Sequence, residues 1–508
     1  MAISILVTLL INPTILRFLI TGFFIYVVSS SVLSWYRLRH FKGPLSASLS
    51  YFFIVKAGTS GRMWDVYKDL NKQYGPLARI GPNDLITDDP DIIRRMSAAR
   101  STYQRSGWYS AMKLNPYQDS MFSLRDTAAH DKLKHRCAAG YAGRENPTIE
   151  AGVDFGIAGF INLIRTKYLS TETELKPLDF GRKTQYLTLD TITKIAFSRE
   201  FGFLATDSDV HRYVESTESM FVFNQLCGEV PWMYSIFHSD WMLGLLGPKA
   251  TDEKGLGKLM GLGKELVVAR FGPDRKDEQD TLGAFVRHGL TQSECETEAL
   301  FQILAGSDTT ATAIRATMLY IITTPRVSQA LRTEIAKGIR DGTISNPITH
   351  DEAKKLPYLQ AVIWEGLRIH APFTGLVPKE VPPGGDTVHG KFIPGGTRIA
   401  HNTWAVLRRA DIFGEDADLF RPERWLGTDT AQTDLMQRTT ELVFGYGRWG
   451  CAGKSLAFLE LNKVFVQLLR NFDLQIIYPA APWQSTNYSL FVQEKMWVRV
   501  TEAGPTDG

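Results

Sequence analysis

The chain has 508 residues, of which 44% are apolar and 22% charged, and its formal net charge is +3. This composition is ordinary for a globular protein with a large core, and the length allows one very large domain or two to three ordinary ones. The near-neutral charge argues against a nucleic-acid-binding protein, and four widely separated cysteines without a C-x-x-C pair argue against a zinc site or a disulfide framework.

The N-terminal segment differs from the rest of the chain. Residues 14–36 are apolar apart from Arg17 and a few hydroxyl side chains, and a helix of this length is roughly 34 Å long, enough to cross a bilayer. A basic cluster follows and is expected to keep the C-terminal end of the helix in the cytosol; it comprises Arg37, Arg39, His40 and Lys42. A cleaved signal peptide is the alternative, but no small-residue cleavage site precedes the cluster. The sequence therefore predicts an uncleaved membrane anchor.

The soluble part is expected to begin with a helix and two strands. Apolar residues recur at helical spacing over 63–74, and two short strand-like runs follow at 77–80 and 85–87. Most later patterns are helical. An aromatic-rich segment at 230–247 is expected to be buried in the core, because such segments usually are; the alternative is a loop that dips into a membrane near a substrate entrance.

The longest helical pattern runs from about residue 291 to 324 and stops at Pro325. Thr291 and Glu294 form a capping-box signature at its start. Its middle, residues 305–310, reads AGSDTT, and glycine alone costs about 1 kcal/mol against alanine inside a helix. Serine and threonine hydroxyls also compete for helix carbonyls. Function explains such a patch in a long helix better than stability does.

The C-terminal part has a mixed pattern. After Arg368 turn signals at 382–385 and 394–396 bracket short strand-like runs such as 397–400. A final helix around 458–472 has apolar residues on one face and is expected to be buried. The expected fold class is therefore mainly helical, with a minor β portion near both ends.

The most informative segment is the glycine-rich loop at 444–453, FGYGRWGCAG, directly before the final helix. The start of that helix directs free N–H groups and the positive end of its dipole at Cys451, which favours thiolate over thiol. The alternative for a lone cysteine is a buried structural thiol. Four residues at fixed spacing argue against it, because Phe444, Gly447, Cys451 and Gly453 match F-x-x-G-x-x-x-C-x-G.

That loop resembles the haem-thiolate loop of the cytochrome P450 family, and the resemblance covers roughly residues 43–500. It implies the cytochrome P450 fold, preceded here by the transmembrane helix. It also implies that Cys451 is the axial thiolate ligand of the iron of haem b, where a thiolate favours O–O cleavage. Phe444 is expected to shield the sulfur from water, and Gly453 to allow close approach of the flat cofactor.

A second motif lies in the long helix, where residues 305–310 match the family pattern A/G-G-x-D/E-T-T. The resemblance makes Asp308 and Thr309 the pair that delivers protons to iron-bound dioxygen. The alternative for Asp308 is an ordinary solvated helix residue, which Gly306 and Thr309 beside it make less favourable.

A third motif is Glu365 and Arg368, which match E-x-x-R. Alone this spacing is a common surface pair worth about 0.2–0.5 kcal/mol. Residues 420–425 match the PERF/PERW segment of the family, and the resemblance makes Arg424 the third member of a buried Glu–Arg–Arg network. Its expected role is structural: it holds the segment that leads to the cysteine loop.

The haem propionates require cations or hydrogen-bond donors. The resemblance places His130 and Lys134 where the family often has Trp or His followed by Arg, and Lys379 where it has a second Arg. Two residues before the cysteine, where Arg is usual, stands Trp449, with Arg448 one position earlier. An indole donates one hydrogen bond without charge, and lysine is a point charge where arginine would fork.

The resemblance implies a cytochrome P450 monooxygenase that inserts one oxygen atom from O2 into a lipophilic small molecule. The sequence is similar to fungal microsomal members of the family, such as pisatin demethylases and secondary-metabolite oxidases. The expected electron source is NADPH, through a separate NADPH-cytochrome P450 reductase, since 508 residues leave no room for a flavin domain. The expected location is the endoplasmic reticulum membrane, with an anchor and linker over 1–44 that break at Gly43-Pro44, and a cytosolic catalytic domain over 45–508.

Two surfaces follow from this reading. The substrate pocket is expected to be lined by Phe301, Ala305, Thr309, Pro372, Phe373, Leu376, Leu490 and Phe491. The reductase is expected to dock on the cysteine side, where positive charge would come from Lys132, Arg136, Lys454 and Lys463.

Two other functions stay open at this point. A haem-thiolate isomerase or dehydratase would need no reductase, but the Asp308-Thr309 pair argues against it. A haem sensor or carrier without turnover would leave the same pair unexplained.

Overall fold

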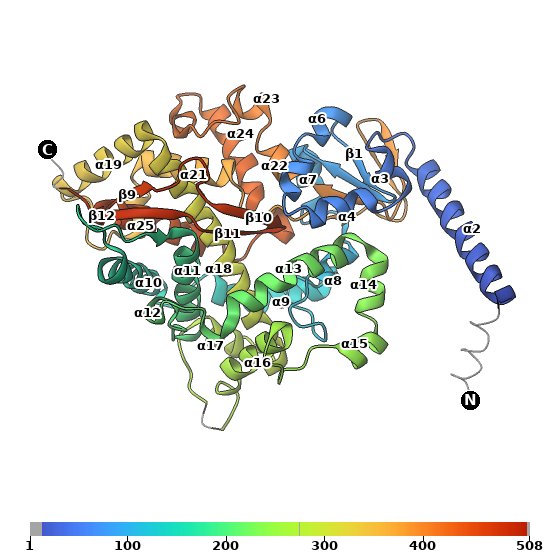
Figure 1. Cartoon of the computed structure of the whole chain (residues 1–508), viewed down its shortest axis with the longest axis horizontal. Coiled ribbons are helices and arrows are strands. Elements are labelled where there is room, and N and C mark those ends of the chain that lie inside the picture. The colour runs from blue at the N-terminus through green and yellow to red at the C-terminus, as the bar shows by residue number, and fades with distance from the viewer. Residues whose placement is uncertain (1–12, 274, 505–508) are drawn as a thin grey trace.

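The computed structural model of the chain describes residues 13–273 and 275–504. Figure 1 shows a body of packed helices with a small β region, and one long helix, α2, that projects from the β side. This is the predicted class, mainly helical with a minor β portion. The helices of the N-terminal half are α2 (Pro13–Arg37), α3 (Leu45–Leu49), α4 (Phe52–Thr59), α5 (Met63–Tyr67), α6 (Leu70–Tyr74), α7 (Pro90–Ser97), α8 (Gly107–Ala111), α9 (Thr127–Tyr141), α10 (Ile149–Leu163), α11 (Phe180–Phe197), α12 (Phe203–Thr206), α13 (Tyr213–Glu229), α14 (Pro231–Phe237), α15 (Asp240–Leu246) and α16 (Gly255–Val268).

The later helices frame the cysteine loop, and the strands form small sheets. The helices are α17 (Thr281–Arg287), α18 (Gln292–Thr323), α19 (Pro325–Arg340), α20 (His350–Ala353), α21 (Pro357–Ile369), α22 (Thr403–Val406), α23 (Ala410–Phe413), α24 (Thr430–Thr440) and α25 (Lys454–Asn471). The strands are β1 (Ala78–Gly81), β2 (Asp84–Thr87), β3 (Gln104–Arg105), β4 (Leu178–Asp179), β5 (Lys379–Glu380), β6 (Asp386–Val388), β7 (Lys391–Ile393), β8 (Arg398–His401), β9 (Phe472–Ile476), β10 (Gln484–Tyr488), β11 (Leu490–Glu494) and β12 (Trp497–Glu502).

The largest sheet joins the two ends of the chain. Its strand order is β1-β2-β8-β5-β3, and β2 pairs with β8 in parallel, with Leu85 opposite Ile399. The predicted strands at 77–80 and 85–87 are β1 and β2. The predicted helix over 63–74 is two short helices, α5 and α6, with Lys68 and the poor helix former Asp69 between them.

Helix α18 crosses the body and has the predicted ends. Thr291 caps its first turn, and the carboxylate of Glu294 accepts a hydrogen bond from the Thr291 N–H at 2.8 Å. The helix continues through residues 305–310 and packs against α11, α16 and α25. Gly306 lies at the contact with α11: a Cβ there would lie 2.8 Å from Ile192, so glycine lets the two helices approach. Helix α25 is buried along the predicted face, including Leu461, Phe465 and Leu468.

Helix α2 is long enough and apolar enough to cross a membrane, and it buries none of its residues. Its C-terminal end is fixed to the body by Arg79 of β1, whose side chain is fully buried. The Arg79 guanidinium donates hydrogen bonds to the carbonyls of Ser34 at 2.8 Å and Trp35 at 3.3 Å, at the end of α2. Further on, a Cβ at Gly43 would lie 2.1 Å from the Arg79 carbonyl oxygen, so only glycine fits there.

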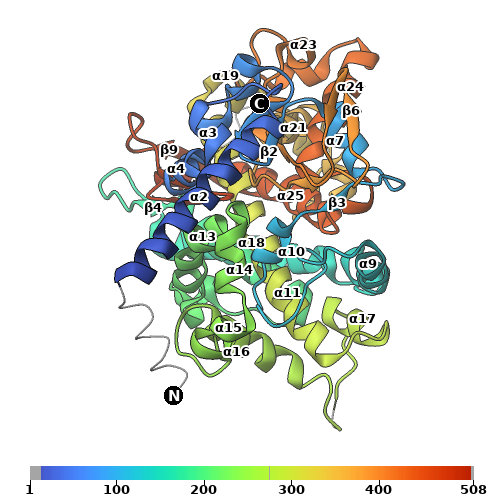
Figure 2. The same ribbon diagram turned by 90° about the vertical axis from the view of Figure 1, so that its right-hand side faces the viewer.

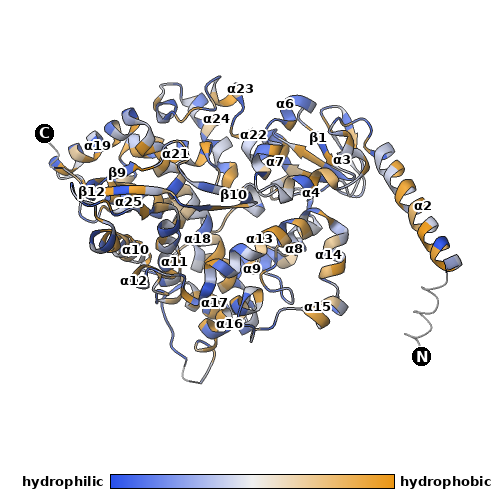
Figure 3. Cartoon of the chain, in the orientation of Figure 1, coloured by the Kyte–Doolittle hydropathy of each residue, from blue (hydrophilic) through white to orange (hydrophobic). Residues whose placement is uncertain are grey.

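The prediction that residues 230–247 are buried in the core is wrong. The segment forms α14 and α15, which bury no residue, and Trp241, Leu245 and Leu246 are 71%, 65% and 73% exposed. The two short helices lie between α13 and α16 in the chain, and among the described residues no further element covers their exposed side. Figure 2 turns toward the viewer the face on which they and α2 lie, and Figure 3 shows the apolar colouring of all three helices.

Candidate functional site

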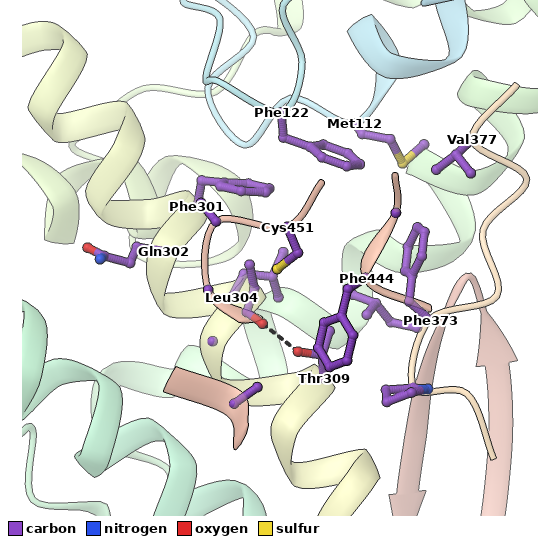
Figure 4. A pocket seen from close by; sticks show the side chains of 18 of the residues that line it. Met112, Phe122, Phe301, Gln302, Leu304, Thr309, Phe373, Val377, Phe444 and Cys451 are labelled. Atoms are coloured by element: carbon purple, nitrogen blue, oxygen red, sulfur yellow. Dashed lines mark hydrogen bonds between the residues drawn. The ribbon is translucent and has the colours of Figure 1, made fainter. Parts of the chain in front are cut away.

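A cavity of about 370 Å³ lies in the body between α18 and the cysteine loop. Its walls come from the segment before α9, from α13 and α18, from the chain after α21, and from the turn between β10 and β11. Apolar and aromatic side chains dominate, as is usual for a small-molecule pocket. Figure 4 shows several of them around Cys451, namely Met112, Phe122, Phe301, Leu304, Phe373, Val377 and Phe444.

The cysteine loop holds Cys451 at the base of this cavity. The Cys451 N–H donates to the Phe444 carbonyl at 2.7 Å, which closes the loop. Gly445 and Gly447 have φ values of +73° and +56°, and a Cβ at Gly447 would lie 2.5 Å from the Ser97 carbonyl oxygen. Glycine is required there for both backbone conformation and space.

Burial and the nearby donors shift the pKa of the Cys451 thiol in opposite directions. Burial raises the pKa of the thiol, whereas the N–H groups of Gly453 and Lys454 and the positive charge of Lys134 act to lower it. Because α25 begins at Lys454, its N-terminal end faces the sulfur. A metal ion bound to the sulfur would remove the thiol proton outright.

In the segment 305–310 of α18, Thr309 and Asp308 point to different sides of the helix. Thr309 lines the cavity, and its hydroxyl donates to the Ala305 carbonyl at 2.7 Å, as Figure 4 shows. Asp308 is buried outside the lining, toward α11, where one carboxylate oxygen accepts from Nε2 of Gln185 at 2.6 Å. Burial raises the pKa of Asp308 to about 6, and the Gln185 hydrogen bond opposes that rise.

Glu365, Arg368 and Arg424 meet in the interior. The Glu365 carboxylate accepts from Arg368 at 2.7 and 2.8 Å and from Arg424 at 3.1 Å. Nε1 of Trp425 donates to it at 2.9 Å. The remaining guanidinium N–H groups of Arg368 reach the carbonyls of residues 407, 417 and 419, so the network ties α21 to the segment that precedes the cysteine loop.

Several donors gather on one side of the cavity. Nζ of Lys379 donates to the Tyr109 hydroxyl at 2.7 Å and lies 4.6 Å from the Trp449 ring. The His130 ring lies 4.5 Å from the same indole. Nζ of Lys134 donates to the carbonyls of residues 448 and 450 at 2.7 and 2.9 Å. All four predicted residues line the cavity.

Three other predicted residues do not reach it. Arg448 pairs with Asp131 at 3.2 Å and lines a separate surface pocket. Phe491 contacts the His370 ring, and Leu376 is buried in a cluster around β1. Side chains alternate along a strand, so Leu490 faces the cavity and the next residue points away. The other pocket residues expected from the sequence line the cavity; they are Phe301, Ala305, Thr309, Pro372 and Phe373.

Two lining residues carry no motif that would have marked them in the sequence. Arg105 donates to the carbonyls of Met121 at 2.8 Å and Leu124 at 2.9 Å and stacks over Trp449, while its Nε has no partner among the described residues. His401 ends β8, and its Nε2 likewise has no described partner. Burial lowers the pKa of Arg105 to about 10 and that of His401 to about 3. Only the three-dimensional neighbourhood identifies these two residues.

The donors that line the cavity test whether it suits a haem. Arg105 and Lys379 have no carboxylate partner among the described residues, and a buried cation requires an anionic one. Burial lowers the pKa of Lys379 well below its usual value, which an adjacent carboxylate would restore. A haem has two propionates for these donors and an iron for Cys451, so the residues fit the group.

Comparison with known proteins decides the family. The model of the family described as "Cytochrome P450" matches residues 43–497. The chain belongs to the cytochrome P450 family. Membership implies a haem cofactor held by a cysteine thiolate, and it confirms the fold and the family predicted from the sequence.

The relatives of this P450 agree with that assignment. "Cytochrome P450 monooxygenase ABA1" of Pyricularia oryzae is 45% identical over 486 residues, which cover 94% of this chain and 95% of that protein. "Cytochrome P450 monooxygenase aba1" of Botryotinia fuckeliana is 44% identical, with coverages of 92% and 93%. The protein is therefore a cytochrome P450 monooxygenase, and the predicted similarity to fungal members is confirmed.

Among solved structures, the heme domain of cytochrome P450DA is similar in fold, with a TM-score of 0.72 at 16% identity. The match covers 92% of this chain and 98% of that chain.

Proposed function

We propose that this P450 inserts one oxygen atom from O2 into a lipophilic small molecule, with electrons from NADPH supplied by a separate NADPH-cytochrome P450 reductase. The observation that carries the proposal is the cavity itself, which has a thiol at its base, the Thr309 hydroxyl on α18 and a largely apolar wall. A bound haem supplies dioxygen activation, which protein side chains alone cannot.

Each group of residues then has a separate task. Cys451 would hold the iron, and Phe444 and Gly453 lie beside it. The propionates would be bound by Arg105, His130, Lys134, Lys379, His401 and Trp449. Thr309 would hold a proton donor at the cavity face and Asp308 would supply protons from the α11 side. The aromatic wall would orient the substrate and exclude water.

The decisive experiment is comparative metabolite profiling of cells with and without this P450, with the reductase supplied. The expected result is a product heavier by one oxygen atom, or a product of its further breakdown, that depends on NADPH and reductase. Turnover that proceeds without either would instead favour an isomerase or dehydratase. Unchanged metabolites together with no NADPH consumption would contradict the proposal.

Fewer of the residues predicted for reductase docking are available in the structure than the sequence indicated. Lys463 is 1% exposed and pairs with Glu150 at 2.6 Å, so it cannot offer charge to a partner. Arg136 is paired with Glu294, whereas Lys132 is exposed and has no ion-pair partner among the described residues. Lys454 is likewise paired, with Glu441 at 2.8 Å. We therefore propose that Lys132 is the residue of this group that contributes to docking.

We also propose that α2 anchors the P450 in the endoplasmic reticulum membrane over 1–44, with the catalytic domain over 45–508 in the cytosol. The exposed apolar side chains of α14 and α15, on the face from which α2 leaves, support contact of this face with the membrane.

A further inference from the structure

The side chain that holds Asp308 comes from a neighbouring helix. Nε2 of Gln185, on α11, donates to a carboxylate oxygen of Asp308 at 2.6 Å. The other carboxylate oxygen is buried and has no hydrogen-bond partner among the described residues. Both side chains are almost completely buried, at 4% and 2% exposure. The bond therefore depends on the close packing of α11 against α18 and lies outside the cavity lining.

The other end of the Gln185 amide is fixed as well. Its Oε1 accepts a hydrogen bond from Nη1 of Arg182 at 2.9 Å. The Arg182 guanidinium pairs with Glu218 at 2.7 Å and with Glu494 at 2.9 Å, and these three side chains are 18%, 24% and 36% exposed. Arg182 can only donate and the Asp308 carboxylate accepts. Both partners therefore require the same amide orientation, with Oε1 toward Arg182 and Nε2 toward Asp308. Asp308 is thus linked through Gln185 to an ion-pair cluster at the surface.

A carboxamide can hold a carboxylate, but near neutral pH it is not an acid or a base that could pass a proton on. Asp308 therefore has to exchange protons through its unpartnered oxygen or after leaving Gln185. Its neighbour in the chain, Thr309, lines the cavity, so release from Gln185 would leave the Asp308 carboxyl group one residue away from the cavity face.

We propose that Gln185 is a positioning residue for proton delivery: it holds the Asp308 carboxylate against α11, and release of this hydrogen bond lets Asp308 carry a proton to the cavity face beside Thr309. The proposal rests on the monooxygenase function proposed above. In each cycle of this movement one proton passes from solvent to the carboxylate and from the carboxylic acid to the acceptor in the cavity. The two electrons come from the reductase, and none passes through Asp308.

The charges around Asp308 come from three helices. Arg182 on α11 and Arg315 on α18 lower the pKa of Asp308, as the Gln185 hydrogen bond does, and Glu218 on α13 raises it. Tyr213 of α13 also faces Asp308. Burial outweighs the lowering effects, and the resulting pKa of about 6 suits a group that takes up and gives protons near neutral pH.

The first test needs no substrate. In the full-length holoprotein, the infrared band of the protonated Asp308 carboxyl group is identified by its loss in Asp308→Asn and is then titrated with pH. Gln185→Leu removes a donor to the charged form, so the titration midpoint is expected to rise by about one pH unit. Gln467→Leu is the matched control, because Gln467 is also buried, on α25, and it is expected to leave the midpoint unchanged. An unchanged midpoint in Gln185→Leu would overturn the proposal.

The second test uses the substrate found by metabolite profiling, with reductase and NADPH. Gln185→Leu is expected to change the solvent deuterium isotope effect and the share of NADPH electrons recovered in product, and to extend product formation to higher pH. In the Asp308→Asn background the same substitution is expected to have no further effect. Additive effects of the two substitutions, or a shifted midpoint with unaltered turnover, would overturn the role in proton delivery. If no NADPH is consumed at all, the proposed function fails, while the infrared result still reports on the contact.

Discussion

The glycines of the cysteine loop are required by its backbone conformation and by close contact with neighbouring backbone. Gly447 lies at φ +56° against the Ser97 carbonyl, so the loop and the end of α7 touch backbone to backbone. A side chain here would have to separate them, and the turn at residues 447–449 that leads to Cys451 would shift with it. The position of the thiol is therefore set by contacts outside the motif as well as within it.

Gly447→Ala is expected to weaken haem retention. The strained φ alone costs roughly 1 kcal/mol or more, and the contact with Ser97 adds to it. The measurement is the fraction of haem retained and the thermal midpoint of the holoprotein. Gly427→Ala is a suitable control, since its Cβ would have no neighbour closer than 3.8 Å. Equal haem retention in both variants would contradict the account of the loop.

Two arginines near the proposed propionate site can be compared directly. Arg105→Ala is expected to lower haem affinity by about 1.5–3 kcal/mol, the usual value of a hydrogen bond to a charged group. Arg448→Ala is expected to change it little, because that guanidinium pairs with Asp131 outside the cavity. Haem transfer to apomyoglobin measures both. A larger loss from Arg448→Ala would place the propionates elsewhere.

At the scale of elements, the contact between α11 and α18 positions residues 305–310, the proposed proton-delivery segment. Ile192 of α11 packs against Gly306 and leaves no space for a methyl group. Because Gln185 and Asp308 lie on the same two helices, the hydrogen bond between them depends on this spacing.

Gly306→Ala is therefore expected to destabilise the protein by about 1–3 kcal/mol through overpacking, which outweighs the better helix propensity of alanine. The double variant Gly306→Ala with Ile192→Ala is expected to recover part of this loss relative to Ile192→Ala alone. Chemical denaturation of the four proteins of the cycle is the measurement. Strict additivity would show that the two side chains do not compete for space.

At the scale of the whole molecule, Arg79 sets how the catalytic body and α2 are joined. Its guanidinium donates to carbonyls at the end of α2 and at the same time bonds to the carbonyls of residues 48, 81 and 82. A buried arginine held by five carbonyls leaves little freedom for a hinge at this place.

Arg79→Ala is expected to broaden the distribution of distances between a spin label on α2 and one on α7, measured in nanodiscs by pulsed electron paramagnetic resonance. Arg95→Ala serves as the control, since Arg95 is half-exposed and pairs with Asp386 of β6 rather than with a residue of α2. A distribution as narrow as that of the unaltered protein would mean that other contacts fix the helix.

What the sequence could predict follows from how local each signal is. The cysteine loop, the capping box at Thr291 and the E-x-x-R spacing are each written in a few consecutive residues, and all can be read directly. Arg105, His401 and Gln185 acquire their surroundings from segments far apart in the chain, so no local pattern marks them. The burial of Lys463 and the exposure of 230–247 depend on which elements cover a face, which apolar content alone does not determine.

The exposed face of α14 and α15 has a consequence for how this enzyme should be assayed. These helices follow directly from α13, which lines the cavity with Phe221 and Gln225, so the path from the proposed membrane face to the cavity would be short. A lipophilic compound partitions into the bilayer, and the enzyme then samples its concentration per volume of lipid rather than per volume of water. Adding inert vesicles at constant total substrate dilutes the compound in this phase, so the apparent KM should rise with the amount of lipid.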